Sequence, residues 1–312
     1  MTPKPRDHGG GLDAAIARHG GTRADWLDLS TGINPVPFPL PALPPACWQQ
    51  LPDEAAAQAL EAAARRFWAV PEGAAVLAAP GASALIARIP ALAPPATVAI
   101  PGPTYNEHAA AFAAHGWRVA EHGGRAQVAV NPNNPTGRTW QAQEITAPLA
   151  VIDESFCDVA PEASLMPLAT RPGTLILKSF GKFWGLAGLR LGFAIGDPAL
   201  VARLAEMLGP WPVSGPALAI GAAALADTAW AETTRSRLAA DAARLDALLA
   251  GAGARVLGGT TLFRLYEVED AARWQRRLAR RHVWSRIFPY NRRWLRLGLP
   301  APGRWGQLEA AP

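Results

Sequence analysis

Four short segments combine residue types that together could hold a phosphate ester and attack a carbonyl carbon. They supply a lysine amine, a carboxylate, side-chain amides and a glycine turn, with serine and arginine nearby. The segments are P-G-A-S at 80–83, N-P-N-N-P-T-G at 131–137, I-D-E-S-F at 152–156 and S-F-G-K-F-W-G-L-A-G-L-R at 179–190. Each alone is ordinary, since such residues also form turns and cap helices. Together they predict a pyridoxal phosphate (PLP) site, because that cofactor needs a lysine nucleophile, an acid for its ring nitrogen, a donor to its phenolate oxygen and a phosphate cup.

Lys182 and Asp153 are the predicted catalytic residues. Lys182 is one of three lysines in the chain and lies between Gly181 and an apolar Phe-Trp-Gly, a setting that favours the neutral amine over the ammonium. Asp153 ends the apolar run L-A-V-I-D. A buried carboxylate there would keep the pyridine nitrogen of the cofactor protonated, which makes the ring an electron sink.

A phosphate cup is predicted at the start of the helical run A-L-I-A-R-I. Backbone N–H groups at a helix N-terminus favour an anion, and the planar guanidinium of arginine can donate two hydrogen bonds to one phosphate. The residues predicted to bind the phosphate are Gly81, Ala82, Ser83, Ser179 and Arg190. Tyr105 follows another apolar run and is predicted to stack on the pyridine ring, with a plain core aromatic as the alternative.

The elements that must position these residues are short apolar runs alternating with helical stretches. Such runs occur at 76–79, 97–100, 127–130, 149–153, 174–178 and 189–195. Unbroken apolar runs are typical of strands buried on both faces, as in a mainly parallel sheet covered by helices. We therefore expect an α/β fold whose site lies in the loops beyond the carboxyl ends of the strands.

The rest of the chain predicts a smaller second lobe. Residues 1–45 are rich in Gly and Pro and form an N-terminal arm that contributes to this lobe. Residues 46–215 form the large PLP-binding domain, and residues 216–312 a long helix followed by a small α+β domain.

Composition excludes several classes of protein. The 312 residues are 50% hydrophobic and 18% charged, as in ordinary globular proteins. No leader or long apolar run is visible, so we expect a cytoplasmic protein without membrane contact. Two cysteines without a C-x-x-C pair predict neither a disulfide framework nor a zinc site, and the evenly spaced His108, His115 and His122 are not expected to bind metal.

A basic and aromatic segment at 273–296 contributes to the net charge of +5 and raises nucleic-acid binding as an alternative function. The apolar residues Ala272, Trp274, Leu278 and Val283 instead favour the solvated face of an amphipathic helix. We therefore expect no nucleic-acid partner.

The same motifs resemble the class I/II aminotransferase superfamily, whose members have the PLP-dependent transferase fold of type I. Coverage runs from about His8 to Leu299. The resemblance implies that Lys182 carries PLP as a Schiff base, Asp153 contacts the ring nitrogen, Asn134 contacts the ring oxygen, and Ser179 and Arg190 bind the phosphate. It also implies a homodimer.

The opening H-G-G at 8–10, followed by W-L-D-L-S-T-G-I-N-P, resembles the threonine-phosphate decarboxylase branch of cobalamin biosynthesis within that superfamily. The implied reaction is loss of CO₂ from L-threonine O-3-phosphate to give (R)-1-amino-2-propanol O-2-phosphate. The alternative is an aminotransferase of histidinol phosphate or a related amino acid. The implied substrate-binding residues are His8, Gly9, Gly32, Asn134, Arg286 and Arg296.

Three residues depart from the pattern of these families. Phe156 stands where many relatives have a tyrosine that donates to the ring oxygen, so Asn134 carries more of that role. Leu51 stands where relatives often have a tyrosine that reaches the partner subunit's cofactor. Gly32 replaces an asparagine of some decarboxylases, which weakens the substrate assignment and leaves the cofactor assignment intact.

Overall fold

The computed structural model describes residues 7–312, and they divide into two compact units. The first unit is Pro37–Thr234. The second combines the described residues up to Val36 with Arg235–Pro312. The predicted domain boundaries at 45/46 and 215/216 stay a prediction.

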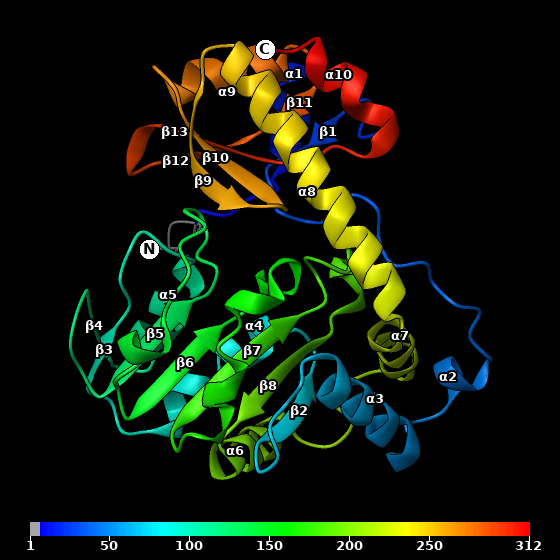
Figure 1. The fold of residues 1–312 in the computed structure, drawn as a ribbon, viewed down its shortest axis with the longest axis vertical. Coiled ribbons are helices and arrows are strands. Elements are labelled where there is room, and N and C mark those ends of the chain that lie inside the picture. Colours follow the sequence, from blue (N-terminus) through cyan, green and yellow to red (C-terminus); the bar gives the residue numbers. More distant parts are fainter. Residues whose placement is uncertain (1–6) are drawn as a thin grey trace. The chain divides into compact units, whose positions relative to one another are not determined.

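The first unit contains a seven-stranded sheet in the order β2-β8-β7-β6-β5-β3-β4 (Figure 1). The strands are β2 (Ala75–Ala79), β3 (Thr97–Ala99), β4 (Arg118–Ala120), β5 (Ala126–Val130), β6 (Leu149–Asp153), β7 (Thr174–Ser179) and β8 (Gly192–Gly196). Neighbours pair in parallel except at β8, which is antiparallel to both β2 and β7. Every residue of β5, β6 and β8 is buried. The predicted α/β fold with a mainly parallel sheet is confirmed.

One strand of this sheet was absent from the prediction. Strand β4 has three residues, of which Arg118 and Val119 are exposed, so it carries no apolar run. It pairs with β3 at the edge of the sheet, where only one neighbour is needed.

Three helices of the first unit begin where short polar side chains accept hydrogen bonds from backbone N–H groups. Asp53, Asp197 and Ser214 cap α3 (Glu54–Phe67), α6 (Pro198–Leu208) and α7 (Gly215–Ala226) in this way. The remaining α-helices of this unit are α2 (Ala46–Gln49), α4 (Ala82–Ile86) and α5 (Asn106–Ala114). Single 3₁₀ turns connect other elements: η1 (Ile89–Leu92), η2 (Ala142–Glu144), η3 (Cys157–Val159), η4 (Pro161–Ala163), η5 (Met166–Thr170) and η6 (Ala187–Leu189).

Aromatic side chains fill the core beside β7 and β8. Trp184 stacks on Phe180 at 5.1 Å and on Trp230 at 5.3 Å between ring centroids. Trp68 meets Phe193 of β8 edge to face at 4.9 Å. These rings bury large apolar areas next to the loop that carries Lys182, so that loop rests on a rigid base.

The predicted long helical stretch after Asp197 is three helices, α6, α7 and α8 (Thr228–Gly251). Gly209 ends α6 with a φ of 75°, and Asp227 separates α7 from α8. Helix α8 passes through the residue at which the compact units divide.

The second unit contains a four-stranded antiparallel sheet in the order β12-β13-β10-β9. The strands are β9 (Arg255–Thr260), β10 (Phe263–Glu267), β12 (Arg286–Phe288) and β13 (Asn291–Gly298). Arm strand β1 (Leu27–Asp28) pairs in parallel with β11 (Val283–Trp284), so two segments about 255 positions apart in the chain share this unit. Its other helical elements are α1 (Leu12–His19), α9 (Ala271–Ala279), η7 (Pro302–Arg304) and α10 (Trp305–Glu309).

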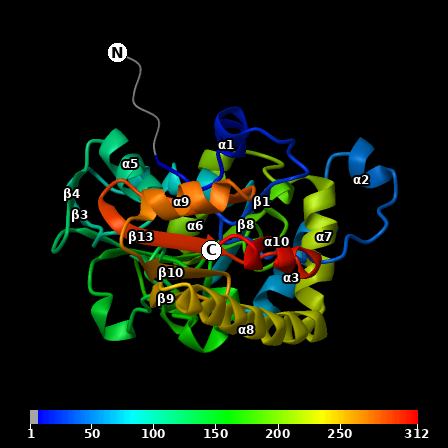
Figure 2. The same cartoon turned by 90° about the horizontal axis from the view of Figure 1, so that it is seen from above.

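Helix α9 packs along β13, as Figure 2 shows from above. Trp274 and Leu278 are buried while Arg273, Arg276 and Arg277 are exposed, which is the amphipathic arrangement predicted from the sequence. The helix ends at Ala279, so the inclusion of Val283 in its apolar face was wrong: Val283 belongs to β11. Across residues 7–312, no helix has the length and apolarity needed to cross a bilayer.

Candidate active site

A cavity of about 130 Å³ lies at the carboxyl ends of the parallel strands in the first unit. It is lined by residues from the loops after β2, β3, β5, β6 and β7. The predicted cofactor residues around it are Ala82, Ser83, Tyr105, Asn134, Asp153, Ser179, Lys182 and Arg190. Residues that are up to about 100 positions apart in the chain therefore meet at one edge of the sheet.

Asp153 presents its carboxylate to the cavity from the last position of β6 and is 3% exposed. Oδ1 accepts a hydrogen bond from the backbone N–H of Ser155 at 2.9 Å, and Oδ2 lies 2.8 Å from Nε2 of His108. Burial acts to raise the pKa of Asp153, but the hydrogen bonds from His108 and Ser155 outweigh it and hold the pKa below its usual value. The carboxylate is therefore charged at neutral pH.

His108 is a site residue that the sequence prediction missed. It was considered only as a metal ligand together with His115 and His122, whereas the structure places it, 1% exposed, against Asp153. Positions three apart share a helix face, and His108 comes three residues after Tyr105 at the start of α5. That spacing is the signal that could have predicted it. Among the residues that the structure describes, no cluster of three or more His, Cys, Asp or Glu could hold a metal ion.

Lys182 lies in the loop between β7 and η6. Its Nζ is 5.5 Å from the centre of the Phe156 ring, so the amine has an apolar neighbour. Phe183 and Trp184, the next two residues, are fully buried. The N–H of Gly185 donates to the Lys182 carbonyl oxygen, and the N–H of Leu186 donates to that of Phe180. Buried anchors and short turns thus fix the backbone that carries the amine.

Gly81 and Arg190 form a cradle at the first turn of α4. Gly81 has a φ of 85° at the N-cap of this helix, a conformation that favours glycine. A Cβ at this position would lie 2.6 Å from Nη2 of Arg190, so the guanidinium lies directly over the glycine. Arg190 also donates from Nη1 to the carbonyl oxygen of Ala187 at 3.0 Å, which orients its side chain. A cation beside backbone N–H groups is a suitable setting for a phosphate.

The asparagines of N-P-N-N-P-T-G have different surroundings. Asn131 donates to the Ala163 carbonyl oxygen and accepts from the N–H of Trp140. Asn133 accepts from the Thr104 hydroxyl and donates to Thr136. Both fix the shape of the loop, whereas Asn134 lines the cavity.

Tyr105 has both of the environments considered from the sequence. It lines the cavity, and it also packs against the apolar core of the unit. Its ring meets that of His108 edge to face at 6.1 Å. Ring stacking on a cofactor stays a prediction for this residue.

Most of the predicted substrate-binding residues gather in the second unit. A Cβ on Gly9 would lie 2.5 Å from the Ser30 carbonyl oxygen and 3.5 Å from Nη2 of Arg296. Nη2 of Arg296 donates to that same oxygen at 2.6 Å. Burial and the nearby charge of Arg286 lower the pKa of Arg296 to about 10, so its guanidinium stays charged at neutral pH. Gly32 is buried two residues after Ser30.

Arg286 is engaged by a carboxylate of the chain itself. Its Nη1 and Nη2 lie 2.7 and 2.6 Å from the two oxygens of Asp7, and Nη1 also donates to the carbonyl oxygen of His8. The pairing shows that this guanidinium is placed to bind an anion bidentately. Asp7 is the anion that the sequence prediction did not consider.

Two of the three residues that depart from the family pattern, Phe156 and Leu51, have different surroundings. Phe156 lines the cavity beside Lys182, as a cofactor-contacting position would. Leu51 is 67% exposed in the first unit, together with Trp48 at 70%.

A mainly parallel sheet with a lysine, a carboxylate and an arginine cradle at its carboxyl edge is the arrangement expected of a PLP-dependent transferase of fold type I. Residues 121–311 match the family model described as aminotransferase class I and II. The chain is 43% identical to a threonine-phosphate decarboxylase of Sinorhizobium sp, covering 98% of this chain and 97% of that protein. It is 41% identical to a threonine-phosphate decarboxylase of Pseudomonas aeruginosa, covering 98% and 96%.

A crystal structure of histidinol-phosphate aminotransferase from Sinorhizobium meliloti in complex with pyridoxal-5'-phosphate superposes with a TM-score of 0.82. It covers 100% of this chain and 96% of that one at 21% identity, which establishes a common fold. The chain belongs to the class I and II aminotransferase family, and the predicted family membership is confirmed.

Proposed function

We propose that the protein is a PLP-dependent carboxy-lyase that converts L-threonine O-3-phosphate to (R)-1-amino-2-propanol O-2-phosphate, a step of cobalamin biosynthesis. The observation that carries the proposal is that Lys182, Asp153 and Arg190 line one cavity in a chain that matches threonine-phosphate decarboxylases over nearly its full length. A nucleophile, an anionic partner for the ring nitrogen and a phosphate ligand are three of the four groups that PLP requires, and Asn134, which lines the same cavity, would be the donor to the phenolate oxygen.

The residues present fit that cofactor. At the phosphate end, the cradle of Gly81 and Arg190 leaves no room for a side chain on Gly81, as expected where a phosphate approaches the backbone. At the ring end, the low pKa of Asp153 supplies a negative charge in a buried position. Phe156 and Tyr105 supply apolar and aromatic walls between the two ends. When bound, PLP would supply an electron sink for the electron pair left behind by CO₂.

Each side chain then has a defined task. Lys182 Nζ would hold the cofactor covalently and, as a protonated amine, would return a proton to the carbon that loses CO₂. Asp153 would hold the proton on the ring nitrogen, because its carboxylate stays charged. Asn134 would donate to the ring oxygen, and Phe156 supplies no donor there.

The choice between losing CO₂ and losing a proton depends on how the substrate anions are held. The bond that breaks is the one aligned with the π system of the cofactor, so the anchors of the phosphate and the carboxylate decide the reaction. We propose that His8, Gly9, Gly32, Arg286 and Arg296 bind these anions, since the guanidinium groups of Arg296 and Arg286 donate to the carbonyl oxygens of Ser30 and His8.

An assay of products tests the proposal directly. Wild-type protein loaded with PLP is expected to release CO₂ from L-threonine O-3-phosphate without any oxo acid, and Lys182→Ala to release none. The alternative, transamination of histidinol phosphate or a related amino acid, predicts product only when 2-oxoglutarate is present and no CO₂. Nucleic-acid binding through the exposed arginines of α9 would show as salt-sensitive retention of DNA or RNA.

A homodimer and a cytoplasmic location are further parts of this proposal. Four large apolar side chains of the first unit are more than half exposed: Leu40, Trp48, Leu51 and Trp211, at 63, 70, 67 and 58%. Exposed apolar side chains of this size are suited to a protein interface where they form one contiguous patch. Leu51 is also the position at which the resemblance places a contact with the partner subunit.

A further inference from the structure

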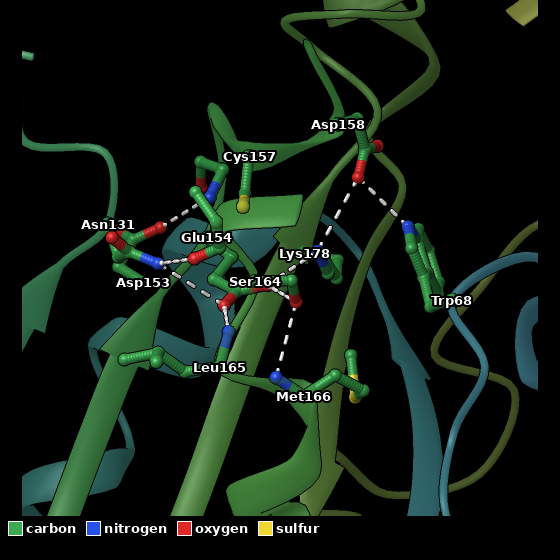
Figure 3. A network of polar contacts seen from close by, with 12 residues as sticks. Trp68, Asn131, Asp153, Glu154, Cys157, Asp158, Ser164, Leu165, Met166 and Lys178 are labelled. Carbon is green, nitrogen blue, oxygen red and sulfur yellow. Dashed lines mark hydrogen bonds and ion pairs between the residues drawn. The ribbon is translucent and has the colours of Figure 1, made fainter. Parts of the chain in front are cut away.

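A cluster of three buried charged side chains, Glu154, Asp158 and Lys178, lies near the carboxyl ends of β6 and β7 (Figure 3). Successive side chains of a strand point to opposite faces, so Glu154 faces away from the cavity that Asp153 lines. Glu154 is 1% exposed, and its Oε2 lies 2.6 Å from Nζ of Lys178. The same carboxylate accepts from the Ser164 hydroxyl at 2.7 Å and from the N–H of Leu165 at 2.5 Å.

Lys178 connects this carboxylate to a second one. Its Nζ lies 3.5 Å from Oδ1 of Asp158, and both side chains are buried. Burial acts to lower the pKa of Lys178, but the charges of Glu154 and Asp158 outweigh it and raise the pKa above its usual value. One ammonium therefore lies between two carboxylates in the interior of the unit.

Asp158 in turn holds the loop that carries Lys182. Its Oδ2 accepts a hydrogen bond from Nε1 of Trp184 at 3.1 Å, and its Oδ1 accepts from Nε1 of Trp68 at 2.9 Å. Trp184 comes two residues after Lys182 and is fully buried. The chain of contacts from Glu154 through Lys178 and Asp158 to Trp184 thus connects the residue next to Asp153 with the loop of the predicted nucleophile.

We propose that Lys178 is a positioning residue that fixes Asp153 relative to Lys182. Lys178 and Glu154 are not among the described residues that line the cavity. Lys178 therefore acts through the backbone of β6 and through Trp184. Burying three charges costs more than packing apolar side chains of similar volume, so stability alone does not account for the cluster. Precise placement of site residues depends on such a supporting shell.

This inference rests on the proposed function for the identity of the cofactor, and it is tested by binding. Lys178→Met is expected to weaken PLP binding by roughly tenfold or more and to shift the pH at which the absorbance of bound PLP changes. Lys178→Arg, which keeps the cation, is expected to restore most of both. The measurements are a PLP titration followed by absorbance and the thermal midpoint of the PLP-free protein.

A matched control separates positioning from general stability. Arg264 pairs with Asp246 in the second unit, with its Nη2 2.8 Å from Oδ2. Arg264→Met is expected to lower the thermal midpoint and to leave the PLP dissociation constant and the absorbance profile unchanged. If Lys178→Met does not fold, the charge-free triple variant Glu154→Gln, Asp158→Asn, Lys178→Met takes its place.

The outcomes are distinct. A folded Lys178→Met or triple variant that binds PLP as wild type does, with the same absorbance profile, overturns the positioning role. Wild-type PLP binding with no decarboxylation refutes the proposed reaction and leaves the role of Lys178 standing on the binding data. Wild-type protein that does not bind PLP refutes both the proposed reaction and the positioning role of Lys178.

Discussion

His108 and Asp153 form a buried pair in which Nε2 of the histidine lies 2.8 Å from Oδ2 of the carboxylate. Together with the Ser155 N–H, this contact outweighs burial, which acts to raise the pKa of Asp153, and holds that pKa below its usual value. His108 therefore acts on the cavity through Asp153, and its loss should change what Asp153 can bind.

His108→Phe is expected to raise the pKa of Asp153 and to weaken PLP binding by about tenfold, because a buried carboxylate loses a charge-assisted hydrogen bond. The measurement is the PLP dissociation constant as a function of pH. His115→Phe is the matched control, since His115 is exposed at the end of the same helix. Equal PLP binding by both variants at all pH values would contradict the role of His108.

The same pair predicts a direction for stability against pH. The folded-state pKa of Asp153 is below its ordinary value of 3.8, so the pair stabilises the protein above that pH and loses this contribution as the pH falls through the folded pKa. The difference in unfolding free energy between wild type and His108→Phe should therefore be largest near neutral pH, about 1 to 3 kcal/mol. It should shrink as the pH is lowered below 3.8. Denaturant unfolding at several pH values measures it, and a difference that grows in acid would contradict this assignment.

Gly81→Ala is expected to reduce PLP affinity by at least tenfold, because the new Cβ would lie 2.6 Å from Nη2 of Arg190 at a φ of 85°. A backbone with φ 85° and ψ 154° is essentially restricted to glycine and adds roughly 1 to 3 kcal/mol of strain for a residue with a Cβ. Gly188→Ala is the control, since a Cβ there meets nothing within 4 Å. A cofactor analogue without the phosphate should bind both variants nearly equally. If Gly81→Ala weakened binding of this analogue as much as binding of PLP, the phosphate would have to lie elsewhere.

How far the sequence predicts this site depends on whether a contact is local. Asp153 and Lys182 follow apolar runs that become parallel strands, and strand ends of a parallel sheet meet at one edge, so their meeting was predictable. The spacing of His108 from Tyr105 could have indicated that His108 lies near the site, but its pairing with Asp153 was not predictable, because α5 and β6 are brought together only by packing. The apolar pattern also indicated helices and the small lobe, but it gave no sign of the exposed edge strand β4.

The pairing of Asp7 with Arg286 was unpredictable for the same reason, since 279 positions separate them.

If Arg286 binds a substrate anion, Asp7 competes for the same guanidinium. Asp7→Asn is then expected to lower the KM for L-threonine O-3-phosphate severalfold with kcat nearly unchanged. Steady-state kinetics measure it, with Asp13→Asn as the control because Asp13 forms an exposed pair with Arg23. A raised KM would instead assign Asp7 to orienting Arg286.

The proposed dimer predicts that charges on the exposed apolar side chains of the first unit separate the subunits. Trp48→Asp combined with Leu51→Asp is expected to raise the dimer dissociation constant by roughly a hundredfold or more, because buried aromatic anchors dominate interface energies. Both side chains are about two-thirds exposed within one chain, so the monomer fold should survive. Sedimentation equilibrium over a range of concentrations measures the constant. Val119→Asp, which places the same charge on the partly exposed strand β4, is the control. Wild-type protein that stays monomeric at every concentration would refute the dimer, and a double variant that remains dimeric would place the interface on another face.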